Sequence, residues 1–183
     1  MKKTILLLLL FVPFFTAQQG FSQDLPINEK TGKVSFENIV EVDGMSKIDL
    51  YLLAEEWFSK TFNSENSVIQ MQDKEEGMII GEGNITAYGH FRNVESGVWK
   101  FTVSFTAKEG RFRYVISDIY HETSVTSTIK GAGGDIKNEK PECGKWLVTK
   151  KQWKKMKERA YTQFQNISKD LEESITISED DNW

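Results

Sequence analysis

Few side chains in this sequence of 183 residues are of the types that perform catalysis or bind metal ions. The two histidines are His90 and His121, and Asp118 and Glu122 lie near the second in sequence. Carboxylates and imidazoles can ligate a metal, but Asp118 and His121 stand three apart in a predicted strand and point to opposite faces. The sequence contains no HExxH motif and no closely spaced histidine pair. We therefore predict no metal site.

The single cysteine, Cys143, would need a base such as His121 to act as a nucleophile. It lies in a segment with glycine and proline on either side, where no helix terminus is predicted to activate its thiol. No Gly-x-Ser-x-Gly motif marks an activated serine, and adjacent glutamate pairs point apart. The sequence thus predicts no catalytic residue and no bound cofactor, and it favours a protein that is not an enzyme.

Positive charge is concentrated in one part of the chain. Residues 130–160 contain ten basic and four acidic side chains, whereas residues 24–122 contain ten basic and seventeen acidic ones. The first half of a predicted helix forms a candidate contact face for polyanions, made of Lys150, Lys151, Lys154, Lys155, Lys157 and Arg159. Because basic helix faces are usually just solvated, any contact with anionic surfaces is predicted to be weak.

The first 22 residues have the order typical of a secretory signal peptide. Lys2 and Lys3 precede an apolar run from residue 5 to residue 15, and a stretch with small residues follows. The run is shorter than the roughly 20 apolar residues that span a membrane, and it contains Pro13. Cleavage is expected after Ser22 or, alternatively, after Gln23, and no nearby cysteine could carry a lipid anchor. The sequence predicts an exported protein of the periplasm, extracellular space or cell envelope, without a membrane span.

The remaining chain is predicted to form one domain from strand, helix, four strands and helix. Alternating apolar residues predict strands at 34–42, 68–72, 78–88, 99–107 and 111–121. Helical spacing predicts helices at about 46–62 and at 146–175. Residues 122–145 are predicted to form a long loop, and residues 176–183 an acidic tail. This order predicts an α+β fold, with a single curved antiparallel sheet of about five strands and the helices packed on one face.

Two strands carry further predictions about packing. Gly81 and Gly83 share one strand face, which permits close approach of a helix. A phosphate-binding loop is the alternative, but a third glycine and a following helix are missing. In the strand at 111–121, the side chains predicted to share the inward face are Phe112, Tyr114, Ile116 and Tyr120.

Short motifs spread over residues 32–121 resemble a family of exported bacterial proteins. They are Gly32-Lys33-Val34, Gly44-Met45-Ser46-Lys47, Leu50-Tyr51, Ala54, Trp57-Phe58, Gly77, Gly81-Glu82-Gly83 and Gly110-Arg111-Phe112-Arg113-Tyr114. The family is the domain of unknown function numbered 4468, which is described as having a TATA-binding-protein-like (TBP-like) fold. The resemblance implies this fold and an envelope setting typical of Bacteroidetes. It implies no site residues, because the family has no assigned active site.

We therefore predict a non-catalytic binding or interaction module whose partner is an unknown envelope protein or polymer. A hydrolase, or an accessory protein that acts on envelope polymers or anionic lipid, is the alternative. Nucleic acid is predicted not to bind, because glutamates on the open sheet face would repel phosphate. The residues predicted on that face are Glu37, Glu41, Glu82, Asn84, Lys100, Thr102 and Thr106.

Overall fold

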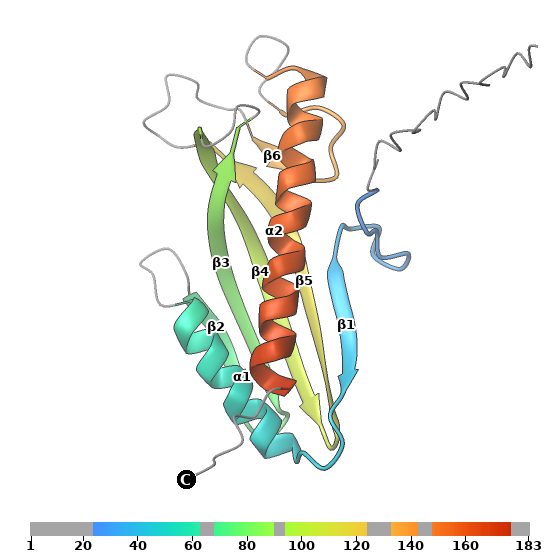
Figure 1. Cartoon of the computed structure of the whole chain (residues 1–183), viewed down its shortest axis with the longest axis vertical. Helices are drawn as coiled ribbons and strands as arrows, with labels where there is room; N and C mark the ends of the chain where they lie inside the picture. Colours follow the sequence, from blue (N-terminus) through green and yellow to red (C-terminus); the bar gives the residue numbers. More distant parts are fainter. Residues whose placement is uncertain (1–23, 63–67, 90–93, 124–132, 143–147, 177–183) are drawn as a thin grey trace, which may run out of the picture.

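The computed structural model describes residues 24–62, 68–89, 94–123, 133–142 and 148–176. One antiparallel sheet is covered on one face by two helices (Figure 1). The strands lie in the order β1 (Phe36–Glu41), β5 (Arg111–Glu122), β4 (Glu95–Lys108), β3 (Met78–Tyr88) and β2 (Val68–Asp73), and β6 (Gly134–Asp135) pairs with β5. The helices are α1 (Lys47–Thr61) and α2 (Lys150–Thr176). The predicted α+β fold with helices on one face is confirmed.

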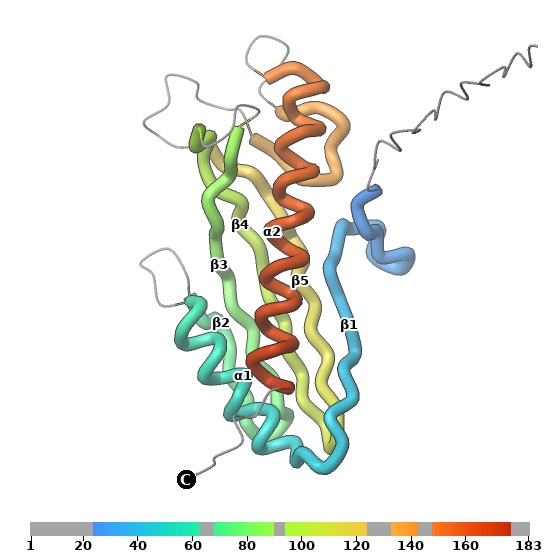
Figure 2. The backbone as a smooth tube through the Cα atoms, viewed as in Figure 1, coloured from blue at the N-terminus to red at the C-terminus, as the bar shows by residue number. Residues whose placement is uncertain are grey.

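The core lies between the sheet and the helices. In the central strand β4 the alternation of the sequence is preserved, and the inward Trp99, Phe101 and Phe105 are at most 4% exposed. Thr102 and Ser104 lie between them on the open face. The long helix α2 runs lengthwise across the sheet (Figure 2) and contributes Trp153 and other fully buried residues to this core.

The two glycines of β3 allow α1 to pack closely against the sheet. A Cβ added at Gly81 would lie 3.0 Å from the ring of Phe58, and one added at Gly83 would lie 2.8 Å from the ring of Phe62. These separations are below ordinary carbon contact distances of about 3.5–4.0 Å. The packing interpretation of the glycines is thus confirmed. The N-cap of α1 is Ser46, whose hydroxyl accepts from the backbone N–H of Asp49 at 3.1 Å.

α2 begins at Lys150 rather than at residue 146, and the preceding Thr149 explains the difference. The Thr149 hydroxyl accepts from the backbone N–H of Gln152 at 3.3 Å, while the Gln152 side chain accepts from the Thr149 backbone N–H at 2.7 Å. This reciprocal pair is a capping box, which stabilises a helix start at this position. The sequence prediction overlooked it.

Tyr120 lies on the open face, so its predicted inward orientation is wrong. Lys100 pairs with Tyr120 and Thr102 pairs with Ser117, which leaves one extra residue in β5. Asp118 sits in this bulge with a positive φ of 55°. The extra residue reverses the alternation, so that Ile119 is buried and Tyr120 is 43% exposed.

Part of the predicted 122–145 loop is ordered structure rather than loop. Its residues Gly134 and Asp135 form β6, which pairs with the end of β5. The next residue, Ile136, is only 1% exposed, and the carbonyl of Asn138 accepts a hydrogen bond from the indole of Trp153 at 2.8 Å. This segment is anchored by a single apolar side chain and one backbone carbonyl. Neither produces a periodic pattern of apolar residues in the sequence, so a loop was predicted.

No helix within the described ranges is both long and apolar enough to cross a membrane.

Candidate functional site

His121, which the sequence analysis considered as a metal ligand and as a base, is a residue of the hydrophobic core. His121 is fully buried, and its ring centroid lies 4.9 Å from that of Trp99 and 5.8 Å from that of Trp153. Asp118 points outward and forms a salt bridge with Lys33, which lowers the pKa of the Asp118 carboxyl. The described residues contain no group of three or more side chains suited to hold a metal ion. His90 and Cys143 lie outside the described ranges.

The basic face predicted on α2 divides into two parts. Four of its residues line one side of a hollow of about 810 Å³, together with Lys137 from the β6 segment. We call it the lysine hollow. Its lining comprises Lys137, Lys150, Lys151, Lys154 and Lys157, the acidic Asp24, Glu139 and Glu158, and the apolar Leu25, Ile27 and Val34.

Lys155 and Arg159 do not line this hollow. Successive residues of an α-helix are about 100° apart, so Lys154 points close to the direction of Lys150, whereas Arg159 points about 180° away. Arg159 donates instead to the backbone carbonyl of Gly89, at the end of β3. Four of the six predicted cations thus line the lysine hollow and two do not, and contact of the six-residue face with a polyanion stays a prediction.

The lysine hollow combines excess positive charge with an apolar floor. Five lysines line it against three carboxylates, and Glu139 is paired with Lys150 at 2.7 Å. Lys157 donates to the carbonyl of Asn138 at 2.9 Å, and burial lowers the pKa of its ammonium. Val34, on the floor, is 3% exposed. The arrangement suits a ligand with an anionic group and an apolar part.

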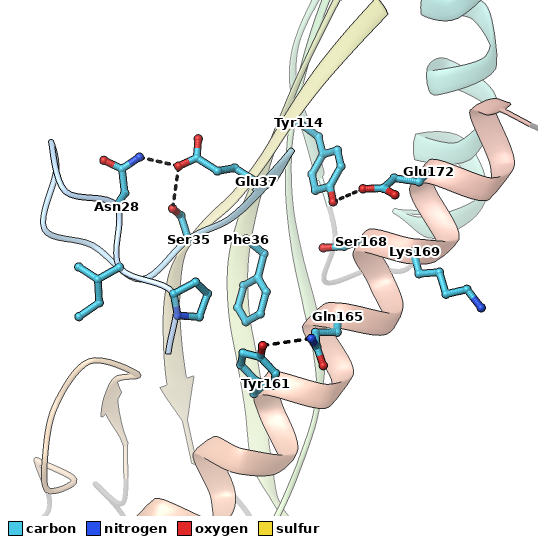
Figure 3. Close-up of a pocket in the computed structure, with 12 residues that line it drawn as sticks. Asn28, Ser35, Phe36, Glu37, Tyr114, Tyr161, Gln165, Ser168, Lys169 and Glu172 are labelled. Atoms are coloured by element: carbon cyan, nitrogen blue, oxygen red, sulfur yellow. Dashed lines mark hydrogen bonds between the residues drawn. The ribbon is translucent and has the colours of Figure 1, made fainter. Parts of the chain in front are cut away.

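A second hollow of about 440 Å³ lies between the N-terminal segment, β1, β5 and α2 (Figure 3). We call it the tyrosine hollow. Its polar lining comprises Asn28, Ser35, Glu37, Tyr114, Tyr161, Gln165, Ser168, Lys169 and Glu172, and its apolar lining Pro26, Ile27 and Phe36. Most of these side chains carry hydroxyl, amide or carboxylate groups, which distinguishes this hollow from the lysine hollow.

Glu172 of α2 is the centre of a hydrogen-bond network in the tyrosine hollow. Its Oε1 accepts from the hydroxyl of Tyr114 at 2.6 Å (Figure 3) and from the amide of Asn38 at 2.9 Å. Burial raises the pKa of Tyr114 well above its usual range, and the bond to Glu172 raises it further. The phenol therefore stays protonated and holds the carboxylate in one orientation.

Glu37 closes the other end of the tyrosine hollow. One of its carboxylate oxygens lies 2.7 Å from the guanidinium of Arg113, and the other accepts from the amide of Asn28 at 2.6 Å. The hydrogen bonds from Arg113 and Asn28 lower the pKa of Glu37, which keeps this carboxylate ionised and its charge balanced.

The two hollows adjoin along α2. Ile27 lines both of them, and Glu158 of one is followed one helical turn later by Tyr161 of the other. Sequence reasoning did not find the tyrosine hollow, because its lining comes from segments far apart in the chain. The only local signal was the spacing of Tyr161, Gln165 and Ser168, three to four residues apart on the polar side of the predicted helix.

The geometry thus defines an α+β protein, with one antiparallel sheet and two hollows beside its long helix. Residues 36–122 match the family model described as a domain of unknown function (DUF4468) with TBP-like fold. The matched region ends at the last residue of β5 and does not include α2, which contributes to both hollows.

Two solved structures share the fold. A TBP-like protein from Parabacteroides distasonis is 18% identical, with a TM-score of 0.67 over 83% of this chain and 98% of its own. A DUF4468 family protein from Bacteroides ovatus is 16% identical, with a TM-score of 0.62 over 81% of this chain and 90% of its own. No curated protein sequence matches the chain.

Proposed function

We propose that this protein is an exported, non-catalytic binding protein of the cell envelope, which holds an anionic amphiphile in the lysine hollow. The observation that carries the proposal is the combination, in one hollow of about 810 Å³, of a lysine rim and an apolar floor. This volume falls within the roughly 300–1,000 Å³ of small-molecule sites.

Each part of the hollow matches one part of such a ligand. Lysine ammonium groups bind phosphate or carboxylate as point charges with several donors. The apolar floor, formed by Leu25, Ile27 and Val34, would shield a hydrocarbon chain from water. Each buried methylene contributes about 0.8 kcal/mol of affinity. The charge and the floor together favour an amphiphile over a purely ionic polymer.

The position of the lysines on α2 supports a role in binding rather than in stability. The first turn of the helix contains Lys150 and Lys151 and no acidic residue. Positive charge near a helix N-terminus interacts unfavourably with the helix dipole, by about 0.3–1 kcal/mol per charge. Charges that lower the stability of their own helix are expected where a ligand requires them.

Export is supported by the order of charged, apolar and small residues in the first 22 positions. We expect the intact mass of the protein recovered from cells to correspond to a chain that begins at Gln23 or Asp24. A chain that retains Met1 would contradict the assignment to the envelope.

Binding is tested by calorimetric titration of the mature chain with dodecyl phosphate below its micellar concentration. Inorganic phosphate and dodecyltrimethylammonium serve as controls that lack the alkyl chain or reverse the charge. We expect dodecyl phosphate to bind at least about tenfold more tightly than either control, because only it engages both the rim and the floor. Equal affinities for dodecyl phosphate and phosphate would refute an amphiphile site.

Two matched variants locate the binding. Lys154→Glu and Lys155→Glu change the charge equally on neighbouring exposed positions of α2, but only Lys154 lines the lysine hollow. Lys154→Glu reverses the charge and should weaken the binding of dodecyl phosphate by about tenfold or more, because each charge near an anionic group contributes about 1 kcal/mol. Lys155→Glu should change the affinity by less than about threefold. Equal losses would show that net charge alone attracts the ligand.

A further inference from the structure

The tyrosine hollow is not used by the proposed function. It lies on the same side of α2 as the lysine hollow but has a different chemistry, with aromatic rings and both donors and acceptors of hydrogen bonds. Its volume of about 440 Å³ is also within the range of small-molecule sites.

Tyr161 provides a flat wall for the tyrosine hollow. Its ring packs against Phe36 with centroids 5.4 Å apart, and its hydroxyl accepts from the side-chain amide of Gln165 at 3.1 Å (Figure 3). Both ends of the side chain are therefore held, while the residue remains partly exposed. A tyrosine held in this way presents an apolar surface with a polar tip.

Hydrogen-bonding capacity remains available around this wall. Both bonds to Glu172 end on Oε1, and no residue in the described ranges donates to Oε2. Gln165 uses its nitrogen toward Tyr161, which leaves its carbonyl oxygen as an acceptor. Ser168 Oγ is buried beside Tyr114 and has no partner of normal hydrogen-bond geometry among the described residues. Such groups favour a ligand that can both donate and accept.

The tyrosine hollow lacks the excess of positive charge found in the lysine hollow. Glu37 is paired with Arg113, and Lys169 is paired with Glu173, which does not line the hollow. Glu172 is held instead by the neutral donors Tyr114 and Asn38. Its carboxylate would repel an anionic ligand, whereas a neutral polar ligand can donate a hydrogen bond to it.

We propose that the tyrosine hollow binds a neutral saccharide unit. The hydroxyls of a sugar donate to Glu172 Oε2 and Gln165 Oε1. The apolar C–H face of its ring packs on Tyr161. This site is independent of the lysine hollow, because it requires neither an anion nor an alkyl chain.

The test is saturation-transfer NMR and titration of the mature chain with neutral sugars: glucose, galactose, mannose, N-acetylglucosamine, maltose and cellobiose. We expect at least one sugar to bind, with saturation strongest on its ring C–H protons. Gln165→Ala should weaken this binding by about three- to tenfold, which corresponds to the loss of one hydrogen bond. Gln165 is exposed and alanine favours helix, so this variant should fold normally.

Control variants separate the saccharide site from general effects. Asn166→Ala changes the neighbouring exposed amide, which does not line the hollow, and should leave sugar binding unchanged. Tyr161→Ala should abolish binding, with folding checked by circular dichroism. Lys154→Glu should not affect sugar binding even though it weakens dodecyl phosphate binding. The proposal is overturned if none of the six sugars binds, or if Gln165→Ala and Asn166→Ala have equal effects.

Discussion

Phe101 offers the most direct test of how the sheet and helices are held together. It lies in the middle of β4, is 4% exposed, and points into the layer between sheet and helices. Its ring meets Phe164 of α2 edge-on, with centroids 5.2 Å apart and planes at 83°, and it meets Phe62 at 6.3 Å. We expect Phe101→Ala to destabilise the protein strongly, because these contacts join both helices to one strand.

The magnitude follows from the buried area. An aromatic side chain removes about 150–250 Å² from water, which corresponds to about 4–6 kcal/mol at about 25 cal/mol/Å². Alanine retains a small part of this area, whereas the cavity that remains costs additional free energy. The edge-to-face contact with Phe164 accounts for about 0.5–1.5 kcal/mol beyond the area. We therefore expect Phe101→Ala to lower the free energy of unfolding by about 3–5 kcal/mol.

The assay is urea-induced unfolding of the mature chain, followed by tryptophan fluorescence and by circular dichroism. Thr102→Ala is the matched control, because Thr102 is the next residue in β4 and lies on the open face. It should change the free energy of unfolding by less than about 1 kcal/mol. A loss below about 1 kcal/mol for Phe101→Ala, or similar losses for both variants, would refute the assignment of the inward face.

Two further changes test local features of the core and of the sheet edge. Gly83→Ala would place a Cβ 2.8 Å from the Phe62 ring, so we expect a loss of about 1–3 kcal/mol in thermal unfolding, partly recovered when Phe62→Leu is added. The hydrogen bond from Arg113 is the chief reason why the pKa of Glu37 lies below its ordinary value of 4.5. The ionised carboxylate therefore contributes its full stabilisation of the fold above about pH 4.5. Stability should therefore fall as the pH drops below about 4.5, and less steeply in Glu37→Gln; parallel pH profiles of the urea midpoint would contradict this reasoning.

Helices and strands could be predicted from the sequence wherever apolar residues recur at a regular spacing. β4 alternates over its whole length, and the fold keeps this alternation because each inward side chain reaches the same core. In β5 the alternation fails after the bulge at Asp118, which explains the wrong orientation of Tyr120. A bulge depends on the pairing with the neighbouring strand, and this pairing is not visible in the strand's own sequence.

The candidate site was less predictable than the fold. The basic character of the first half of α2 was evident from the sequence, but the division of its cations depends on what packs beside the helix. Lys157 reaches the carbonyl of Asn138, whereas Arg159 reaches that of Gly89 on the opposite side. The partner carbonyls belong to different segments, so only the assembled structure distinguishes the two cations.

The sequence by itself determined the order of the elements, the inward faces of most strands and the concentration of positive charge, because each of these depends on residues that are close together in the chain. The tertiary structure decided which polar side chains meet. Asn38 and Tyr114 both donate to Glu172, although they precede it by 134 and 58 residues. Such contacts form only when α2 lies across β1 and β5, and their position is set by the packing of the shared apolar core rather than by any local pattern.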